Sequence, residues 1–188
     1  MRKCEWCGKS IVGKNGQARF CTSAHRVYAH RAAKNAPPYP AELISRNRWV
    51  RWAPVIRKGK TTKVPLAAAG DYASSTNPDT WSSFAMAAES TVGVGLGYVL
   101  GDGIGCIDLD HCINNGVLDD EAEYFIANYP GNYIEISPSG DGLHIWGIAA
   151  EAPGTKRSFN GLSIERYSVD RYITITGNIY QHGDLLPL

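Results

Sequence analysis

The sequence predicts a mixed α/β (α+β) domain with a mostly antiparallel sheet, preceded by a small cysteine-rich module. Strand-like and helix-like segments are intermixed after about residue 43, rather than forming separate blocks. In the C-terminal half, short turns separate the strand-like segments, which is typical of antiparallel neighbours. Three of the five cysteines lie before residue 22. We therefore expect a module at 1–31, a proline-rich linker at 32–42 and a main domain at 43–188.

The first elements of the main domain are a strand and a helix. The apolar segment at 48–55 predicts a strand. A helix is predicted at 77–90, with Asn77 as its N-cap and Pro78 in its first turn. Its apolar face would consist of Trp81, Phe84, Ala85 and Ala88.

The rest of the main domain is predicted to be rich in hairpins. Two strands flank the Gly-Asp-Gly turn at 101–103, and a helix follows over 119–128 with Phe125 and Ile126 facing inward. The two strands cover residues 93–100 and 103–110. Two further hairpins are expected, from segments 132–136 with 142–148 and 162–167 with 171–177.

Composition and charge point to a soluble protein that meets a polyanion. No segment approaches the roughly 18 apolar residues of a membrane span, and the first ten residues lack the apolar stretch of a signal peptide. We therefore expect a cytoplasmic location. Through Lys63 the chain has 15 Lys and Arg and two acidic residues, whereas the remainder has 4 basic and 16 acidic residues. Such a front part favours nucleic acid as a partner; the alternative is a solvated basic arm.

Three cysteines and a histidine near the N-terminus have the spacing of a zinc site. The pattern C-x2-C-x13-C-x3-H is formed by Cys4, Cys7, Cys21 and His25. Tetrahedral Zn²⁺ takes thiolate and imidazole ligands in close pairs joined by a longer loop, and Gly8 supplies the tight turn. About thirty residues bury too little apolar surface to fold alone, so the metal would supply the folding energy. The alternative is a disordered basic arm with unpaired surface cysteines.

This segment resembles small bacterial zinc modules of the pattern C-x-x-C-G followed by R-F-C-S-x-x-C-R. His25 stands where those modules have a fourth cysteine, and His30 is the alternative ligand. The other two cysteines, Cys106 and Cys112, are expected to be buried small hydrophobic side chains rather than ligands.

Two aspartates in the segment CIDLDHC are candidate metal ligands. Asp108 and Asp110 lie two apart in a strand and project from one face, while Ile107 and Leu109 project into the core. Adjacent like charges persist most readily around cations, and carboxylate oxygens suit Mg²⁺ or Mn²⁺. Such a pair can hold two metals for nucleotidyl transfer. The alternative is two solvent-facing aspartates at a strand end.

A Ser- and Gly-rich turn at 137–142 is a candidate anion site. Its backbone amides and the hydroxyls of Ser137 and Ser139 can cradle an anion, and His144 in the following strand can hydrogen-bond a phosphate oxygen. A tight hairpin alone would also explain this turn.

Glu165 is the candidate third carboxylate, because it lies mid-strand among apolar residues. The alternatives are that it is a charge on an exposed strand face, or that Asp170 in the next turn takes its place. Lys63 and Arg171 are candidates for contact with nucleotide phosphates or template, with solvated surface as the alternative. Three tryptophans are expected in the core rather than as base-stacking platforms: Trp49, Trp52 and Trp146.

In this order, the motifs D-x-D, S-P-S-G-x-G-x-H and I-E-x-Y with R-Y-x-T-x-T-G resemble those of primase-polymerases of phages, plasmids and other mobile elements. These proteins belong to the archaeo-eukaryotic primase superfamily. Motif one would be Asp108 and Asp110, motif two Ser139 to His144, and motif three Glu165. The resemblance covers about residues 45 to 180. It implies an RRM-like core, catalytic Mg²⁺ or Mn²⁺, a DNA template and primer, and dNTPs or NTPs as substrates.

The chain departs from many such enzymes at its C-terminus. It ends eleven residues after Gly177 and has no GxxxxGK[ST] loop of a fused helicase. We therefore expect that a separate helicase or helical accessory subunit supplies these functions, or that the chain only extends primers. Two other functions stay open: a metal-dependent nuclease, and a non-catalytic, zinc-dependent nucleic-acid-binding or regulatory subunit on a primase-like scaffold.

Overall fold

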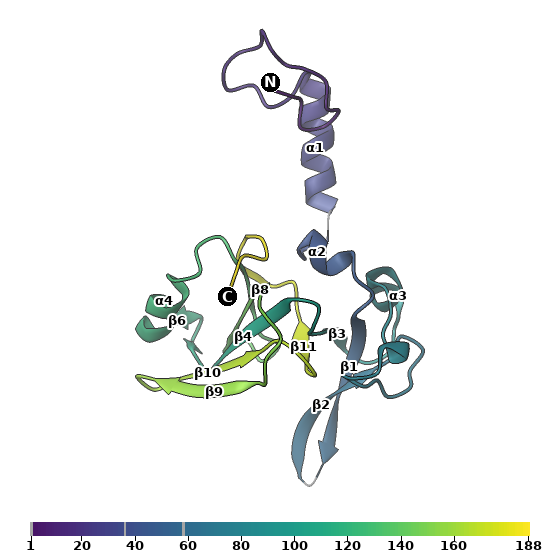
Figure 1. The fold of residues 1–188 in the computed structure, drawn as a ribbon, viewed down its shortest axis with the longest axis vertical. Coiled ribbons are helices and arrows are strands. Elements are labelled where there is room, and N and C mark those ends of the chain that lie inside the picture. The colour runs from purple at the N-terminus through teal and green to yellow at the C-terminus, as the bar shows by residue number, and fades with distance from the viewer. Residues whose placement is uncertain (1, 36, 58) are drawn as a thin grey trace. The chain divides into compact units, whose positions relative to one another are not determined.

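The computed structural model describes residues 2–35, 37–57 and 59–188, and the chain divides into two compact units, Met1–Pro37 and Pro38–Leu188 (Figure 1). The first unit consists of turns, a β-bridge between Lys3 and Ser10, and helix α1 (Ser23–Asn35). Helix α1 thus continues into the segment expected to be a linker. Within the described residues, no helix has both the length and the apolar character needed to span a membrane.

The second unit contains two large sheets. The four-stranded sheet has the order β11-β3-β1-β2, and the six-stranded sheet has the order β12-β7-β8-β4-β10-β9. The strands of the first are β1 (Trp49–Arg57), β2 (Lys60–Leu66), β3 (Gly95–Val99) and β11 (Tyr172–Ile175). Those of the second are β4 (Ile104–Asp110), β7 (Tyr133–Ile136), β8 (Leu143–Ile148), β9 (Thr155–Phe159), β10 (Leu162–Tyr167) and β12 (Ile179–Gln181). All of these strand pairs are antiparallel, which confirms the predicted fold class.

The remaining elements are short. A small hairpin is formed by β5 (Ile113–Asn114) and β6 (Val117–Leu118). The helices are α2 (Ala41–Ile44), the 3-10 helix η1 (Pro78–Thr80), α3 (Phe84–Glu89) and α4 (Asp120–Ile126). Helix α4 lies within the predicted segment 119–128, and its Ile126 is buried.

The prediction of one helix at 77–90 was wrong, because two short helices lie there. The Asn77 side chain caps only η1, by accepting the N–H of Asp79. Ser83 caps α3 separately. Between them, Ser82 exchanges two backbone hydrogen bonds with Trp49 of β1. This pairing holds the chain extended, so a tertiary contact overrides the local helical pattern.

One of the three expected strand pairs around a short turn is confirmed and the other two are wrong. Strands β7 and β8 pair around the Ser/Gly turn. Strands β10 and β11, however, lie in different sheets, and so do β3 and β4. The chain crosses between the sheets at Asp102 and Asp170, both of which have positive φ angles, 52° and 54°. Strands β3 and β11 pair with each other. The chain therefore leaves the four-stranded sheet after β3 and returns to it as β11, next to β3.

The centre of the six-stranded sheet has the order β7-β8-β4-β10, with α4 between β4 and β7 in the chain. In chain order these strands are second, third, first and fourth, the RRM-like order that the resemblance implies. An RRM-like fold has a second helix between its last two strands. In the part of the chain described here, strand β9 occupies that connection instead.

A hydrophobic core covers each face of this sheet. On one face, Ile107 and Leu109 pack with Ala122 and Ile126 of the α4 helix, as predicted. The other face packs on the four-stranded sheet through residues that include Trp49, Tyr98, Cys106 and Trp146. Asp108 alternates with Ile107 and Leu109, so it faces the four-stranded sheet.

The core predictions for single residues are mostly confirmed. Trp49 and Trp146 are fully buried, whereas Trp52 is only partly buried. Cys106 and Cys112 are also fully buried. Burial raises the pKa of both thiols, that of Cys112 to about 11, so they remain neutral thiols at physiological pH.

Candidate active site and metal centres

A row of ionisable side chains crosses the six-stranded sheet at the level of Asp108. Asp108 pairs with His144 of β8 on one side and with Glu165 of β10 on the other. His144 pairs in turn with Glu135 of β7, and Glu165 with Lys156 of β9. Directly paired residues project from the same face with Cβ atoms about 4.5–5.5 Å apart. Strand register therefore brings together three candidates that lie far apart in the sequence.

The carboxylates of this row crowd one another. Burial raises the pKa of Asp108 above its usual value. His144 and Lys63 lower this pKa, while the charges of Asp110 and Glu165 raise it further. Oxygen ligands held close together against their own repulsion form a donor set that fits Mg²⁺ or Mn²⁺.

Glu165 has two partners of its own. Its carboxylate forms an ion pair with Lys156 and accepts a hydrogen bond from the hydroxyl of Tyr167. The Lys156 contact, followed by the Tyr167 contact, lowers the pKa of Glu165, so it is ionised at neutral pH. Asp170, the alternative third carboxylate, lies outside the strands. The register favours Glu165, because it is the direct neighbour of Asp108.

His144 is almost fully buried and is held between two carboxylates. Its Nδ1 atom lies 3.2 Å from Oε1 of Glu135, and its Nε2 atom lies 3.7 Å from Oδ1 of Asp108. A carboxylate only accepts hydrogen bonds, so Nδ1 carries a proton and donates a hydrogen bond to Glu135. This contact directs Nε2 toward Asp108.

Glu135 is a site residue that sequence reasoning missed. Its carboxylate is completely buried, and besides His144 it accepts hydrogen bonds from five donors. These are the Tyr133 hydroxyl (3.1 Å), the Trp146 Nε1 (3.4 Å), the Thr176 backbone N–H (3.0 Å) and hydroxyl (3.2 Å), and the Gly177 N–H (2.9 Å). The T-G end of the R-Y-x-T-x-T-G segment therefore binds Glu135. The signal was present, because Glu135 is, like Glu165, a carboxylate within an apolar strand.

A cavity of about 670 Å³ adjoins this row, and five of the residues named from the sequence line it: Lys63, Asp108, His144, Asp170 and Arg171. Asp110 and Glu165 are not among the residues that line it. This volume is within the range of small-ligand sites. The Lys63 ammonium lies 5.8 Å from the ring centre of Trp52, and the Arg171 guanidinium lies 4.5 Å from that of Tyr167. Sequence reasoning missed Ser74 and Ser75, which also line the cavity.

Ser137 and Ser139 do not line this cavity. Their hydroxyls hydrogen-bond each other at 2.9 Å in the β7–β8 turn, which lies beside the Asp110 end of β4. A Cβ atom on Gly142 would lie 2.5 Å from the Leu109 carbonyl oxygen, so only glycine allows this approach. His111 and Asp141 fasten the turn through a contact of 2.6 Å.

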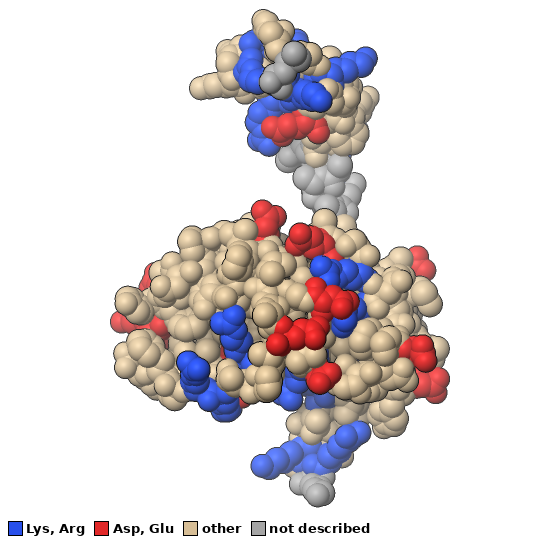
Figure 2. Space-filling model, viewed as in Figure 1, with Lys and Arg blue, Asp and Glu red and all other residues tan. Residues whose placement is uncertain are grey.

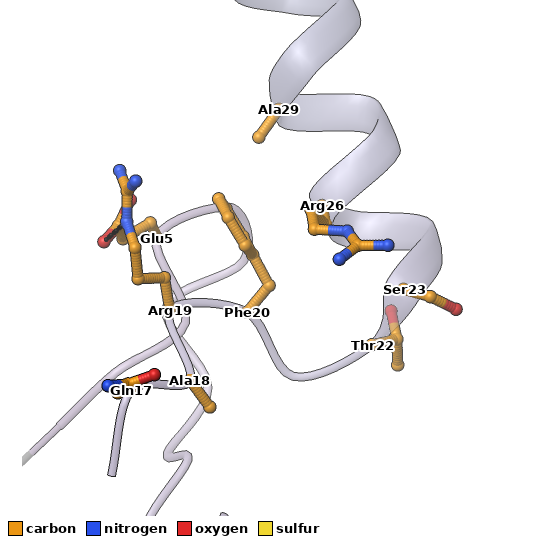
Figure 3. A pocket seen from close by; sticks show the side chains of 9 residues that line it. All are labelled: Glu5, Gln17, Ala18, Arg19, Phe20, Thr22, Ser23, Arg26 and Ala29. Carbon is orange, nitrogen blue, oxygen red and sulfur yellow. Dashed lines mark hydrogen bonds and ion pairs between the residues drawn. The ribbon is translucent and has the colours of Figure 1, made fainter. Parts of the chain in front are cut away.

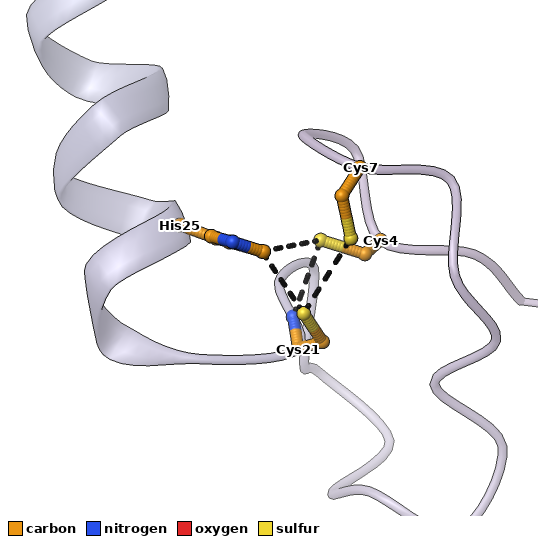
Figure 4. A group of neighbouring side chains, drawn as sticks. All are labelled: Cys4, Cys7, Cys21 and His25. Carbon is orange, nitrogen blue, oxygen red and sulfur yellow. Dashed lines mark hydrogen bonds between the residues drawn. The ribbon is translucent and has the colours of Figure 1, made fainter.

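The first unit gathers the four predicted zinc ligands (Figure 4). One ligand atom from each of Cys4, Cys7, Cys21 and His25 lies within 4.8 Å of the others. The sulfurs of Cys7 and Cys21 are 3.6 Å apart, close to the roughly 3.8 Å expected for two thiolates on a tetrahedral Zn²⁺. The side chain of His30, the alternative ligand, lies outside the described residues. The arrangement is compatible with zinc.

Backbone hydrogen bonds around Cys4 stabilise its thiolate form. Gly8, at φ 70°, closes the turn by donating its N–H to the Cys4 carbonyl oxygen at 2.9 Å. The Cys21 N–H donates to the Cys4 sulfur at 3.3 Å. Burial raises the pKa of Cys4, but backbone hydrogen bonds outweigh it and lower this pKa to about 5. A thiolate is the form that binds a metal.

A second cavity of about 820 Å³ lies in the first unit, between α1 and the preceding loop (Figure 3). The Phe20 ring lines it together with Arg19 and Arg26. Arg19 forms an ion pair with Glu5, whereas Arg26 has no carboxylate partner among the described residues. This wall therefore has uncompensated positive charge beside an aromatic ring, a combination suited to nucleic acid.

An antiparallel RRM-like sheet that presents a D-x-D pair beside a third carboxylate and a buried histidine is the arrangement expected of the primase-polymerase class. One comparison with a known protein agrees. Over 149 residues, or 73% of its length, the chain is 36% identical to a DNA primase-polymerase of Nitratiruptor phage NrS-1. The chain is thus related to a phage-type primase-polymerase, which confirms the family that the sequence resembles. It spans 20% of the length of that relative. No family model matches the chain.

Proposed function

We propose that this chain performs metal-dependent, template-directed nucleotidyl transfer, as a DNA primase or polymerase in the replication of a phage or mobile element. The observation that supports this most is the strand register, which sets Glu165 and His144 on either side of Asp108 beside a cavity. The related phage protein is named for this activity. Such an enzyme would act in the cytoplasm of an infected bacterial cell.

Asp108, Asp110 and Glu165 are the proposed ligands of two Mg²⁺ or Mn²⁺ ions. When bound, such ions activate the attacking hydroxyl and neutralise the leaving pyrophosphate. The three side chains project from one face of two adjacent strands whose other face is in a core. This rigid support is what a preorganised metal site needs.

His144 is the proposed ligand of the nucleotide triphosphate. For Nε2 to donate to a phosphate oxygen, the ring must be protonated at both nitrogens. The buried Glu135 carboxylate holds the ring from its Nδ1 side. Lys63 and Arg171 line the same cavity and are proposed to bind nucleotide phosphates or template. Ser137 and Ser139 are proposed to bind phosphate from the neighbouring turn.

The first unit is proposed to bind one structural Zn²⁺ and to contact DNA. The ligand set would be Cys4, Cys7, Cys21 and His25. Three thiolates and an imidazole favour a borderline-soft ion over Mg²⁺. A separate helicase or helical accessory subunit is a further proposed partner.

Primer extension tests the proposal. The whole chain is incubated with a primer–template duplex, labelled dNTPs or NTPs, and Mg²⁺ or Mn²⁺, beside a nuclease assay on the same DNA. We expect extension, and Asp108→Ala should reduce it by at least about 100-fold, because even outer-shell changes at metal sites cost about 10–100-fold. Asp120→Asn, which changes an exposed carboxylate at the start of α4, is the matched control and should retain activity.

The outcomes separate the candidate functions. Cleavage without extension would indicate a nuclease. DNA binding with neither extension nor cleavage would indicate a non-catalytic subunit. Either result would refute nucleotidyl transfer by this chain.

A further inference from the structure

The outer part of β1 and β2 leaves the four-stranded sheet as a two-stranded ribbon. Strand β1 pairs with β3 only over Trp49–Trp52, whereas it pairs with β2 out to Arg57 and Lys60. Residues 54–57 and 60–63 are named the β1–β2 ribbon here; they project beyond the sheet (Figure 1). Ile56 in this ribbon is 77% exposed. Packing on the rest of the unit therefore does not account for this ribbon.

The β1–β2 ribbon has uncompensated positive charge. Arg57 and Lys60 are direct cross-strand neighbours, an arrangement that like charges destabilise. No Asp or Glu occurs between residues 43 and 70 of the sequence. Within the described part of the chain, neither Arg57 nor Lys60 forms an ion pair, unlike the basic residues that pair with Glu5, Asp102 and Glu165. Figure 2 shows basic side chains gathered at this end of the second unit.

The base of the ribbon lies at the candidate active site. Lys63 and Thr62 line the cavity that Asp108 and His144 also line. In the strand pairing, Pro54 is opposite Lys63 and Ile56 is opposite Thr61, so these four share one face of the ribbon. An exposed apolar side chain therefore follows Lys63 along a surface that leads away from the site.

We infer that the β1–β2 ribbon binds the sugar–phosphate backbone of the duplex formed by the template and the growing strand. Arg57 and Lys60, which share the other face of the ribbon with the cavity residue Thr62, contact phosphates. A two-stranded β-ribbon has dimensions that suit a duplex groove. A strand that grows on a template leaves the site as duplex, and the ribbon begins at the cavity that Asp108 and His144 line. This inference rests on the proposed function, and it adds the surface that holds the substrate.

Salt-dependent DNA binding by the whole chain, without nucleotides, tests the inference. A primer–template duplex and a single strand of equal length serve as ligands. On duplex DNA each lost phosphate contact reduces the slope of log K against log salt by about 0.9. Arg57→Gln and Lys60→Gln should each lower the slope by about this amount, and the double variant by about 1.8. The charge-preserving pair Arg57→Lys with Lys60→Arg should keep the slope of the parent.

Arg157→Gln is the matched control, because it removes an exposed arginine from β9. It should leave the slope unchanged. The inference is overturned if the double variant keeps the parent slope, if Arg157→Gln lowers the slope equally, or if only single-strand binding changes. In extension assays the double variant should raise KM for the duplex without changing kcat at saturating DNA.

The DNA-binding and primer-extension results distinguish a failure of the ribbon assignment from a failure of the proposed function. If the parent chain does not extend primers but the double variant still lowers the duplex slope, the proposed function fails and the ribbon assignment stands. If the parent extends primers and the slope does not change, the ribbon assignment alone fails.

Discussion

The first unit and the six-stranded sheet each gather four side chains into a candidate functional site, but they do so by opposite means. Cys4, Cys7, Cys21 and His25 lie close together in the sequence, on turns and the first turn of α1. Asp108, Asp110, His144 and Glu165 come from three strands whose pairing is supported by a core on each face. We propose that the first set needs a bound metal to hold the chain, whereas strand pairing positions the second set without one.

The largest difference should appear when zinc is withheld. Cys21→Ser, or a strong thiol-competent chelator, should unfold the first unit and leave the second folded. Structural Zn²⁺ contributes about 10–16 kcal/mol in small zinc-dependent folds, and this unit has little other core. Hydrogen exchange resolved along the chain measures this, together with elemental analysis.

The control for zinc is Cys112→Ala, which removes a thiol outside the cluster and should keep one zinc per chain. Purified parent protein without zinc would contradict the proposal that the first unit depends on a bound metal. So would zinc retained after Cys4, Cys7 and Cys21 are all replaced.

The carboxylate site of the six-stranded sheet should lose activity but keep its fold when a ligand is removed. Asp110→Ala should reduce primer extension by about 100-fold or more, since it removes a proposed metal ligand. The fold should survive with equal or higher stability, because the change relieves repulsion between carboxylates. Thermal unfolding without metal and primer extension with Mg²⁺ measure the two effects. A folded variant with near-normal activity would refute the role of Asp110.

Glu135→Gln tests whether Glu135 positions His144 for its proposed contact with the nucleotide. Its effect should be smaller than that of Asp110→Ala. Glu135→Gln keeps the shape of the side chain but places an amide among the donors that bind Glu135. We expect KM for the nucleotide to rise by about 10–100-fold, as for other outer-shell partners of a functional histidine. His144→Ala should raise the same KM.

The two changes should not be additive. If Glu135 acts through His144, the double variant should be little worse than His144→Ala alone. Additive losses, or a loss confined to DNA affinity, would contradict this role of Glu135.

The sequence predicted which face of a strand each side chain lies on better than it predicted which strands pair with each other. Alternation placed Ile107 and Asp108 on opposite faces of the strand, and the structure agrees, because side-chain period follows from the backbone alone. Alternation does not specify the neighbouring strand. A short turn such as 101–103 therefore suggested a hairpin where the chain changes sheets, and the turn at 168–170 misled in the same way. The bond network of Glu135 was out of reach, since its donors lie up to 42 residues away in the sequence.

The smallest expected effect concerns the contact between His111 and Asp141, which holds the Ser/Gly turn at 137–142 in the second unit. The hydrogen bond and charge of Asp141 raise the pKa of His111 above its usual 6.5. Contacts with Ser139 and then His111 lower the pKa of Asp141 below its usual 3.8. The contribution of His111 to stability is therefore complete below pH 6.5 and is lost as the pH rises through its raised pKa. The contribution of Asp141 is present above pH 3.8 and is lost as the pH falls through its lowered pKa.

The pair should thus stabilise the turn most between these two ranges. Asp141→Asn should return the pKa of His111 toward 6.5 and remove the loss of stability at higher pH, whereas Asp120→Asn should change neither. The titration of His111 by NMR, beside unfolding free energies from pH 5 to 9, measures this. Because the pair is exposed and its attraction is screened by solvent, the change in stability should be small. A pKa of His111 that is the same in the parent and in Asp141→Asn would show that the turn is held by its backbone bonds and by the close approach of Gly142 to β4 alone.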